Sequence, residues 1–222
     1  MLDEIFYSKC IGCDKKISIN RTVCEDCIAH IPYVHSSCEK CGYPLSINGK
    51  ICKNCFNINY YNKLFIPFWY SGIVKILLKK IKFEYNLNGV KLLDQLFSKR
   101  LYKLERYDIV TSVPSYFWRH FRRFVHPAEF LAKRISKVYS IKYEVLLERV
   151  RYTEYQWKLK KSKRKENIKD AFSPKKELFD LKILLVDDIM TTGATIRECA
   201  KTLKDAGAAK VDCYVFSKGL FI

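Results

Sequence analysis

The chain has 222 residues, 49% of them hydrophobic, and a formal net charge of +18. This composition is typical of a globular protein and excludes a largely disordered chain, and the length allows one sizeable α/β domain with a small unit beside it. No basic region followed by an apolar core is present at the N-terminus, and the most apolar window, residues 64–78, is interrupted by Pro67 and Lys75. We therefore expect a cytoplasmic protein without signal peptide or membrane span.

Eight of the ten cysteines form four Cys-x-x-Cys pairs that recur every fourteen residues. The pairs are Cys10/Cys13, Cys24/Cys27, Cys38/Cys41 and Cys52/Cys55. In a cytoplasmic chain this pattern indicates zinc ligation rather than disulfides. Since four thiolates complete one tetrahedral site, the sequence predicts two structural zinc ions with no open coordination position. Residues 1–60 hold few apolar side chains, so metal binding would supply much of their folding free energy.

The four Cys-x-x-Cys pairs, or knuckles, can share two metal ions in two ways. The first two can share one metal and the last two another, or the pairs can interleave in a cross-brace. A repeat of twenty-eight residues bears on the choice, because Ser18-Ile19-Asn20 and Ser46-Ile47-Asn48 stand at the same offset after the first and the third pair. The repeat favours two self-contained units, a double zinc ribbon, and leaves the cross-brace as the alternative.

A second domain is expected over residues 61–222, where predicted strands alternate with predicted helices. The strands are expected at 64–70, 108–113, 143–147, from 183 onward, and at 210–216, and the helices at 73–82, 90–104, 128–139 and from Thr195 to Gly207. This alternation is typical of an α/β fold with a parallel, doubly wound sheet and helices on both faces. Ligands of such sheets bind beyond the carboxyl ends of the strands.

Two basic segments are candidates for anion binding. Arg119, Arg122 and Arg123 follow the strand at 108–113, and their planar guanidinium groups suit a pyrophosphate. A solvated surface near a helix start is the alternative. The second segment has Trp157 beside the cations Lys158, Lys160, Lys161, Lys163, Arg164, Lys165 and Lys169. Cations next to aromatic rings are typical of single-stranded nucleic acid grooves, although a mobile loop that closes over a phosphate ligand would have a similar composition.

The most informative stretch runs from Ile183 to Thr195. Four apolar residues precede the adjacent carboxylates Asp187 and Asp188, and Thr-Thr-Gly-Ala-Thr follows two residues later. The pattern predicts a strand buried on both faces, an acidic edge, a tight turn and a helix start. Such a turn aims backbone N–H groups and the helix dipole at one point, where a phosphate can bind. The acids can accept hydrogen bonds from sugar hydroxyls or face a hydrated divalent metal. The alternative is a strand-to-helix turn that binds nothing.

This stretch resembles the phosphoribosyl-pyrophosphate (PRPP) motif of type I phosphoribosyltransferases, whose paired acids hold the ribose 2- and 3-hydroxyls and whose threonine-rich turn holds the 5-phosphate. The resemblance implies a catalytic, ribose-binding role for Asp187 and Asp188. It also implies Mg²⁺ bound with PRPP. The implied phosphate-binding residues are Thr191, Thr192, Gly193, Ala194 and Thr195.

With the paired cysteines ahead of it, the whole chain resembles the ComF/ComFC family of competence-associated proteins. Tyr70-Ser71-Gly72, the Lys82-Phe83 pair and the pattern of residues 149–172 contribute to this resemblance. The pyrophosphate and flexible-loop residues that it implies are Arg119, Arg122, Arg123, Gln156 and Arg164. One segment departs from the family, because His126-Pro127 stands where Asn-Gln is usual.

Two functions follow from this resemblance, and both stay open. In the first, the chain binds PRPP or a related ligand and handles single-stranded DNA during DNA uptake in natural transformation, with the DNA-uptake machinery as partner. In the second, it is a Mg-dependent phosphoribosyltransferase or PRPP sensor of unknown acceptor. The intact acidic pair favours retained sugar-phosphate binding, whereas His126-Pro127 argues against a standard transferase. We expect DNA uptake to be the cellular role.

Overall fold

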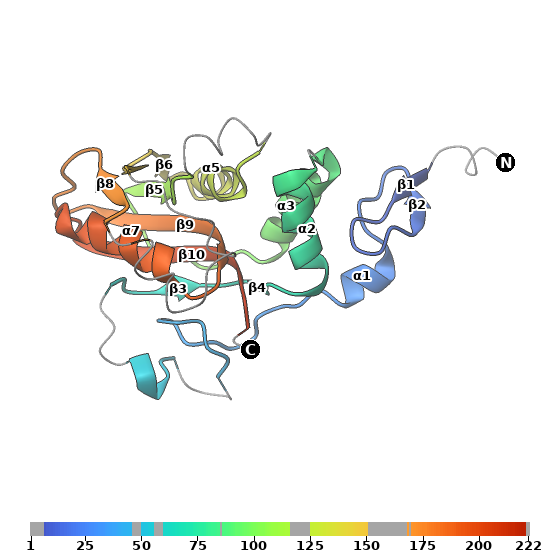
Figure 1. Ribbon diagram of the computed structural model, residues 1–222, viewed down its shortest axis with the longest axis horizontal. Helices are drawn as coiled ribbons and strands as arrows, with labels where there is room; N and C mark the ends of the chain where they lie inside the picture. Colours follow the sequence, from blue (N-terminus) through green and yellow to red (C-terminus); the bar gives the residue numbers. More distant parts are fainter. Residues whose placement is uncertain are drawn as a thin grey trace.

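A six-stranded sheet forms the centre of the computed structural model, which describes residues 7–45, 50–55, 60–84, 86–115, 125–150, 168 and 170–220. The strand order is β3-β10-β9-β5-β6, with β4 also paired to β10, and all of these pairings are parallel (Figure 1). The strands are β3 (Leu64–Phe65), β4 (Phe68–Trp69), β5 (Ile109–Ser112), β6 (Lys142–Tyr143), β9 (Lys182–Met190) and β10 (Lys210–Lys218). The predicted parallel sheet is confirmed.

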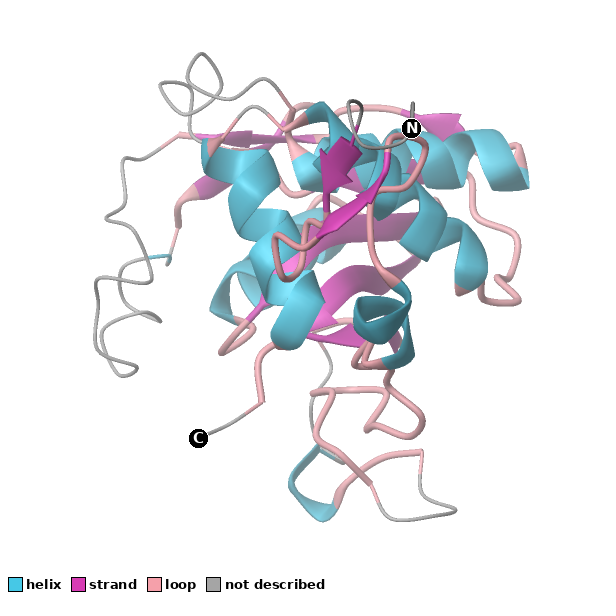
Figure 2. Ribbon diagram, turned by 90° about the vertical axis from the view of Figure 1, so that its right-hand side faces the viewer, coloured by secondary structure: helices cyan, strands magenta, loops and turns pink. Residues whose placement is uncertain are grey.

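Helices cover both faces of this sheet, as the sequence predicts (Figure 2). Leu184 and Val186 of β9 lie in one core cluster with α2, α3 and α5, whereas Ile183 and Leu185 lie in a second cluster under α7. This alternation explains why the strand is apolar at every position. The helices are α2 (Gly72–Phe83), α3 (Leu87–Lys99), α5 (Pro127–Tyr139) and α7 (Ala194–Asp205). Within the described ranges, no helix combines the length and hydrophobicity needed to span a bilayer.

Two predicted strands divide in the structure. The strand expected at 64–70 forms as β3 and β4, interrupted at Pro67, which has no N–H to donate to the ladder. Its carbonyl accepts a hydrogen bond from the Val34 N–H at 2.9 Å. The strand expected at 143–147 is β6 in the main sheet, and the chain then enters β7 (Leu147–Arg149), which pairs antiparallel with β8 (Phe172–Pro174).

The helix expected at 90–104 is shifted toward the N-terminus. It is α3, which begins after Asn86, whose side chain caps the first turn, and it ends before Arg100. Residues 101–107 leave the helix but still pack on the core. The Tyr102 carbonyl accepts a hydrogen bond from the Tyr139 hydroxyl at 2.6 Å, and its ring centroid lies 5.1 Å from that of Phe65. Tertiary contacts therefore replace helical hydrogen bonds in a segment whose apolar spacing continues the helical pattern.

Two cysteine units lie against different parts of the sheet domain (Figure 1). The first cysteine unit, residues 7–31, contains β1 (Tyr7–Lys9), β2 (Lys16–Ser18) and α1 (Glu25–Ala29) and packs on α2 and α3. The second cysteine unit, residues 36–45 and 50–55, contains η1 (Lys53–Cys55) and lies beside β3 and β10. Figure 2 views the molecule from the side of the first unit.

Candidate metal centres and ligand site

The eight paired cysteines form two clusters. Within each cluster the four Sγ atoms lie within 4.8 Å of one another, and the members are Cys10, Cys13, Cys24 and Cys27 in the first and Cys38, Cys41, Cys52 and Cys55 in the second. Four thiolates this close fit a tetrahedral zinc ion with Zn–S bonds of about 2.3 Å. The predicted sequential pairing is confirmed, and the interleaved cross-brace is excluded.

The two clusters repeat each other in their hydrogen bonds. The Cys10 Sγ accepts from the Cys24 N–H at 3.3 Å, and the Cys38 Sγ accepts from the Cys52 N–H at 3.3 Å. Burial raises the pKa of these two thiols, but backbone N–H donors outweigh it and lower the pKa to about 6 for Cys10 and about 7 for Cys38. Backbone donors thus favour the thiolate, which is the form that ligates a metal.

The candidate phosphate loop joins β9 to α7 at the carboxyl end of the sheet. Gly193 precedes α7 with φ 76°, a left-handed conformation that side chains rarely adopt. A Cβ at this position would lie 2.8 Å from an Arg197 guanidinium nitrogen and 3.3 Å from the Met190 Sδ. The Ala194 N–H donates to the Thr192 hydroxyl at 3.4 Å, which closes the turn. Residues 191–193 therefore form the turn that leads into α7, and Ala194 and Thr195 begin the helix, as the sequence predicts.

The acidic pair lies within β9 rather than beyond its end. Asp188 is 8% exposed, and its N–H donates to the Asp187 Oδ1 at 2.9 Å. Burial and the neighbouring charge of Asp188 raise the pKa of Asp187 to about 8, and Lys82 opposes the shift. A carboxyl group in this environment gains from any cation or hydroxyl donor that stabilises its charged form.

Lys82 is a site residue that sequence reasoning missed. Its Nζ lies 2.6 Å from the Asp188 Oδ2, and the two side chains are only 16% and 11% exposed. Lys82 belongs to the last turn of α2, so this helix reaches the end of β9. Burial and the charge of Asp188 also raise the pKa of the nearby Tyr70. From the sequence, Lys82 was noted only as part of the Lys82-Phe83 pair that contributes to the family resemblance. No feature of the neighbouring sequence distinguished it from the other lysines of α2.

Comparison with known proteins agrees with this arrangement. A double zinc ribbon domain matches residues 1–56, and a phosphoribosyl transferase domain matches residues 125–219. Competence protein F of Haemophilus influenzae is 29% identical over 164 residues, which cover 69% of this chain and 72% of that protein. The chain therefore combines a double zinc ribbon with a phosphoribosyl transferase domain and is similar to a competence protein over most of its length.

Two further proteins are similar to parts of the chain. The DNA utilization protein YhgH of Escherichia coli O157:H7 is 28% identical to this chain over 158 residues, or 68% of the chain and 70% of that protein. Glutamine phosphoribosylpyrophosphate amidotransferase from B. subtilis, complexed with ADP and GMP, is 20% identical with a TM-score of 0.38 and covers 59% of this chain and 28% of that one. A TM-score this low supports no argument about function.

The departure from the ComF-family pattern at residues 126–127 builds a helix start. Pro127 is the first residue of α5, where a missing N–H removes no helical hydrogen bond. The His126 Nδ1 lies 3.4 Å from the hydroxyl of Ser115, which follows β5. Five residues predicted for the pyrophosphate and the flexible loop lie outside the described residues: Arg119, Arg122, Arg123, Gln156 and Arg164.

Proposed function

We propose that this chain binds PRPP or a related phosphoribosyl ligand with Mg²⁺ at the end of β9, and that it handles single-stranded DNA during DNA uptake. One observation carries the ligand half of the proposal. The carboxylates of Asp187 and Asp188 stand two residues before a turn that starts α7, so sugar-hydroxyl acceptors and a helix N-terminus adjoin each other.

Each part of the site has a role in this proposal. Asp187 and Asp188 accept hydrogen bonds from the ribose hydroxyls, and their oxygens are the hard ligands that Mg²⁺ and its water shell prefer. The bound metal ion supplies positive charge opposite the pyrophosphate. Thr191 to Thr195 offer hydroxyls and the first N–H groups of α7 to the 5-phosphate. Lys82 neutralises Asp188 before the ligand arrives, so ligand binding has to replace or share that ion pair.

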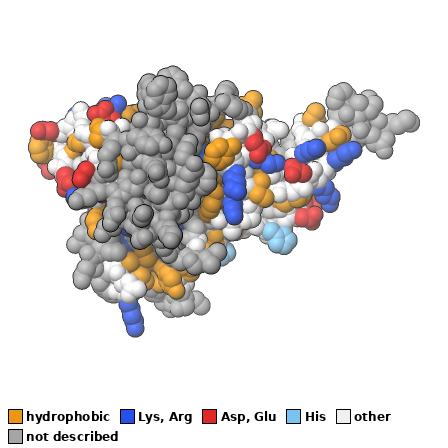
Figure 3. All heavy atoms as spheres, viewed as in Figure 1, with side chains coloured by type: hydrophobic (Ala, Val, Ile, Leu, Met, Phe, Trp, Pro, Cys, Tyr) orange, Lys and Arg blue, Asp and Glu red, His pale blue; other side chains and the backbone are white. Residues whose placement is uncertain are grey.

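The DNA half of the proposal rests on charge and on the relatives. A net charge of +18 favours encounters with polyanions, and the two relatives are named a competence protein and a DNA utilization protein. The first cysteine unit mixes basic with acidic side chains (Figure 3), and its Lys15 and Arg21 form ion pairs with Asp26 and Glu25. We therefore assign DNA contact to the basic segment 158–169, which lies outside the described residues except Ile168.

Calorimetry with PRPP plus Mg²⁺, set beside fluorescence anisotropy with a labelled single-stranded oligonucleotide, tests both halves separately. The variant Asp187→Ala/Asp188→Ala should lose PRPP affinity while its DNA affinity stays near that of the wild type. Equal PRPP affinity in the two proteins would remove the sugar-binding role. Release of pyrophosphate from PRPP in the presence of an acceptor base would instead favour the transferase.

A further inference from the structure

Lys218 is a lysine buried beneath the candidate phosphate loop. Its exposed fraction is 0%, and it sits in β10 between Trp69 of β4 and Met190 of β9. Its Nζ donates to the carbonyl oxygen of Gly219 at 3.2 Å and to that of Thr191 at 3.4 Å. Burying an ammonium group is unfavourable unless acceptors surround it. The acceptors in this case include the first residue of the loop.

The aliphatic part of Lys218 lies against the second cysteine unit. A Cβ built on Gly42 would approach the Lys218 Cδ to 2.5 Å and the Ile66 Cδ1 to 2.3 Å. Gly42 directly follows the metal-binding pair Cys38/Cys41, and its N–H donates to the Cys38 carbonyl at 2.8 Å. The Lys218 side chain therefore contacts the Cys38/Cys41 knuckle with its aliphatic part and the phosphate loop with its ammonium group.

The sequence repeat shows why residue 42 is glycine. The equivalent residue of the first unit, twenty-eight positions earlier, is Asp14, with φ 58° against 68° for Gly42. The same left-handed backbone therefore accepts a side chain in the first unit, where Asp14 pairs with Lys80 at 2.9 Å. At residue 42 a side chain would also have to displace Lys218 or Ile66, so the backbone conformation is not the whole reason for the glycine.

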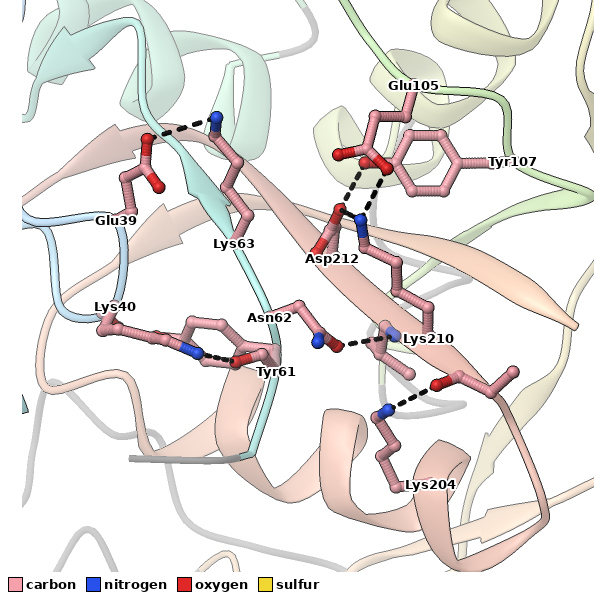
Figure 4. Close-up of polar contacts among 12 residues, drawn as sticks. Glu39, Lys40, Tyr61, Asn62, Lys63, Glu105, Tyr107, Lys204, Lys210 and Asp212 are labelled. Atoms are coloured by element: carbon pink, nitrogen blue, oxygen red, sulfur yellow. Dashed lines mark hydrogen bonds and ion pairs between the residues drawn. The ribbon is translucent and has the colours of Figure 1, made fainter. Parts of the chain in front are cut away.

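The knuckle that carries Gly42 is fastened to the segment before β3 (Figure 4). The Lys40 Nζ donates to the Tyr61 carbonyl at 2.8 Å, and the Tyr61 hydroxyl donates back to the Lys40 carbonyl. Glu39 pairs with Lys63 at 3.2 Å. Tyr61 is 1% exposed, so this contact is part of the protein interior. The place of Gly42 relative to Lys218 is thereby set by the folded knuckle.

We propose that Lys218 is a positioning residue for the phosphate loop, and that the second metal cluster holds Lys218 in place through Gly42. The inference rests on the proposed function in one respect, which is that residues 191–195 bind the phosphate of the ligand. By holding the Thr191 carbonyl, Lys218 orients the peptide that opens the loop. The contacts of the first cluster within the described ranges lead to α2 and α3 instead.

The variant Lys218→Met tests the role of the ammonium group, because methionine keeps an unbranched stem beside Gly42. We expect both zinc ions to stay bound, PRPP affinity to fall at least about tenfold, and amide hydrogen exchange in residues 190–195 to speed up even without ligand. The hydrogen-exchange measurement tests the positioning role of Lys218 separately from the proposed PRPP binding. If the wild type does not bind PRPP, the proposed function fails, and loop exchange still decides whether Lys218 positions the loop.

A matched pair, Gly42→Ala and Asp14→Ala, tests the link to the metal knuckle. Both variants have alanine at the left-handed residue after a Cys-x-x-Cys pair, but only Gly42→Ala adds a Cβ, which would displace Lys218. Gly42→Ala should speed loop exchange and weaken PRPP binding, and Asp14→Ala should do neither. This pair also decides the matter if Lys218→Met does not fold. Equal loop exchange in the two alanine variants, or wild-type loop exchange in folded Lys218→Met, would overturn the proposal.

Discussion

The two cysteine units repeat each other in ligand spacing and in N–H to sulfur hydrogen bonds, yet they meet the sheet domain in different ways. In the first unit, Gly12 packs on Ile73 of α2 and the Thr22 hydroxyl donates to Gln95 of α3 at 3.2 Å. In the second unit, Gly42 packs on Lys218 of β10. The cysteine spacing therefore determines the metal-binding cluster. A few positions between the cysteines determine which part of the sheet domain each unit packs against.

The two units consequently approach different halves of the ligand site. The first unit is linked to the acidic pair indirectly, through α2. Its Asp14 pairs with Lys80 of this helix, and Lys82 of the same helix pairs with Asp188. The second unit reaches the phosphate loop through the side chain of Lys218. We therefore expect the second cluster to influence ligand binding more strongly than the first.

Removing one ligand from each cluster tests this comparison with the largest expected effects. Cys10→Ser and Cys38→Ser should each lower the zinc content from two ions to one, since the clusters share no ligand. Structural zinc sites contribute about 10–16 kcal/mol in zinc-finger peptides, so each unit should lose most of its order. PRPP affinity should fall strongly for Cys38→Ser and much less for Cys10→Ser. Elemental analysis and calorimetry measure both quantities, and release of both ions by either variant would contradict independent clusters.

The acidic pair can be removed without touching either metal. Asp187→Ala/Asp188→Ala should lose charge-assisted hydrogen bonds that contribute about 1–3 kcal/mol each. PRPP affinity should then fall at least about tenfold, for which about 1.4 kcal/mol suffices. Zinc content should remain at two ions per chain. A fall in zinc content would mean that the acids support the cysteine units, which would remove the distinction between the two halves of the site.

Anchoring strength offers a sharper test of how each unit is held. Tyr61→Phe removes the hydroxyl that donates to the Lys40 carbonyl in the interior, and leaving a buried acceptor unpaired costs about 1–3 kcal/mol. Lys80→Met removes the ion pair with Asp14, which is well exposed, and should change stability little. Chemical denaturation followed by circular dichroism compares the two variants. A greater loss for Lys80→Met would reverse the proposed order of anchoring.

The pH dependence of stability tests the raised pKa of Asp187, which belongs to the acidic pair that faces Lys82 of α2. The pKa of Asp187 is raised to about 8 in the folded protein, against about 3.9 in an unfolded chain. The folded state therefore binds more protons between these values, and stability should fall as pH rises toward and through the folded pKa. Asp187→Asn should flatten this fall between about pH 4 and 8 in Mg-free buffer.

Thermal midpoints, which shift by about 2–4 °C for each kcal/mol in a chain of this size, measure the effect. Lys82→Met should extend the fall to higher pH, because Lys82 lowers the pKa of Asp187. An identical pH dependence in the wild type and Asp187→Asn would contradict the raised pKa.

The smallest effect on the two units is expected from the basic segment 158–169, to which we assign DNA contact. Neutralising Lys160, Lys161, Lys163 and Arg164 should leave zinc content unchanged and weaken binding to all single-stranded sequences alike. The slope of log affinity against log salt should flatten by about 0.7 for each phosphate that the segment no longer neutralises. Trp157→Ala should cost about 1–3 kcal/mol if a base stacks on the ring. If PRPP binding weakens while the salt slope stays unchanged, the segment serves the PRPP site instead.

Apolar periodicity predicted most of the fold, and the cysteine repeat predicted the pairing of the metal ligands. The run before Asp187 identified β9 because a strand buried on both faces needs apolar residues at every position. The end of α3 was missed because Tyr102 continues an apolar pattern while its backbone bonds to Tyr139. Lys82 and Lys218 were missed for a related reason. A lysine in a regular element has the same local pattern whether solvent or a distant carboxylate or carbonyl meets its ammonium group.

The position of β10 in the sheet has a consequence for synthesis on the ribosome. β10 pairs with β3, β4 and β9, and it follows every other described strand in the chain. At about 5–20 residues per second, translation from residue 42 to residue 218 takes on the order of ten seconds or more. During that time the second unit can bind its metal but has no Lys218 to dock against. The nascent chain can therefore hold a metal-bound second unit, already in contact with Tyr61 and Lys63, before the strand that carries Lys218 has been made.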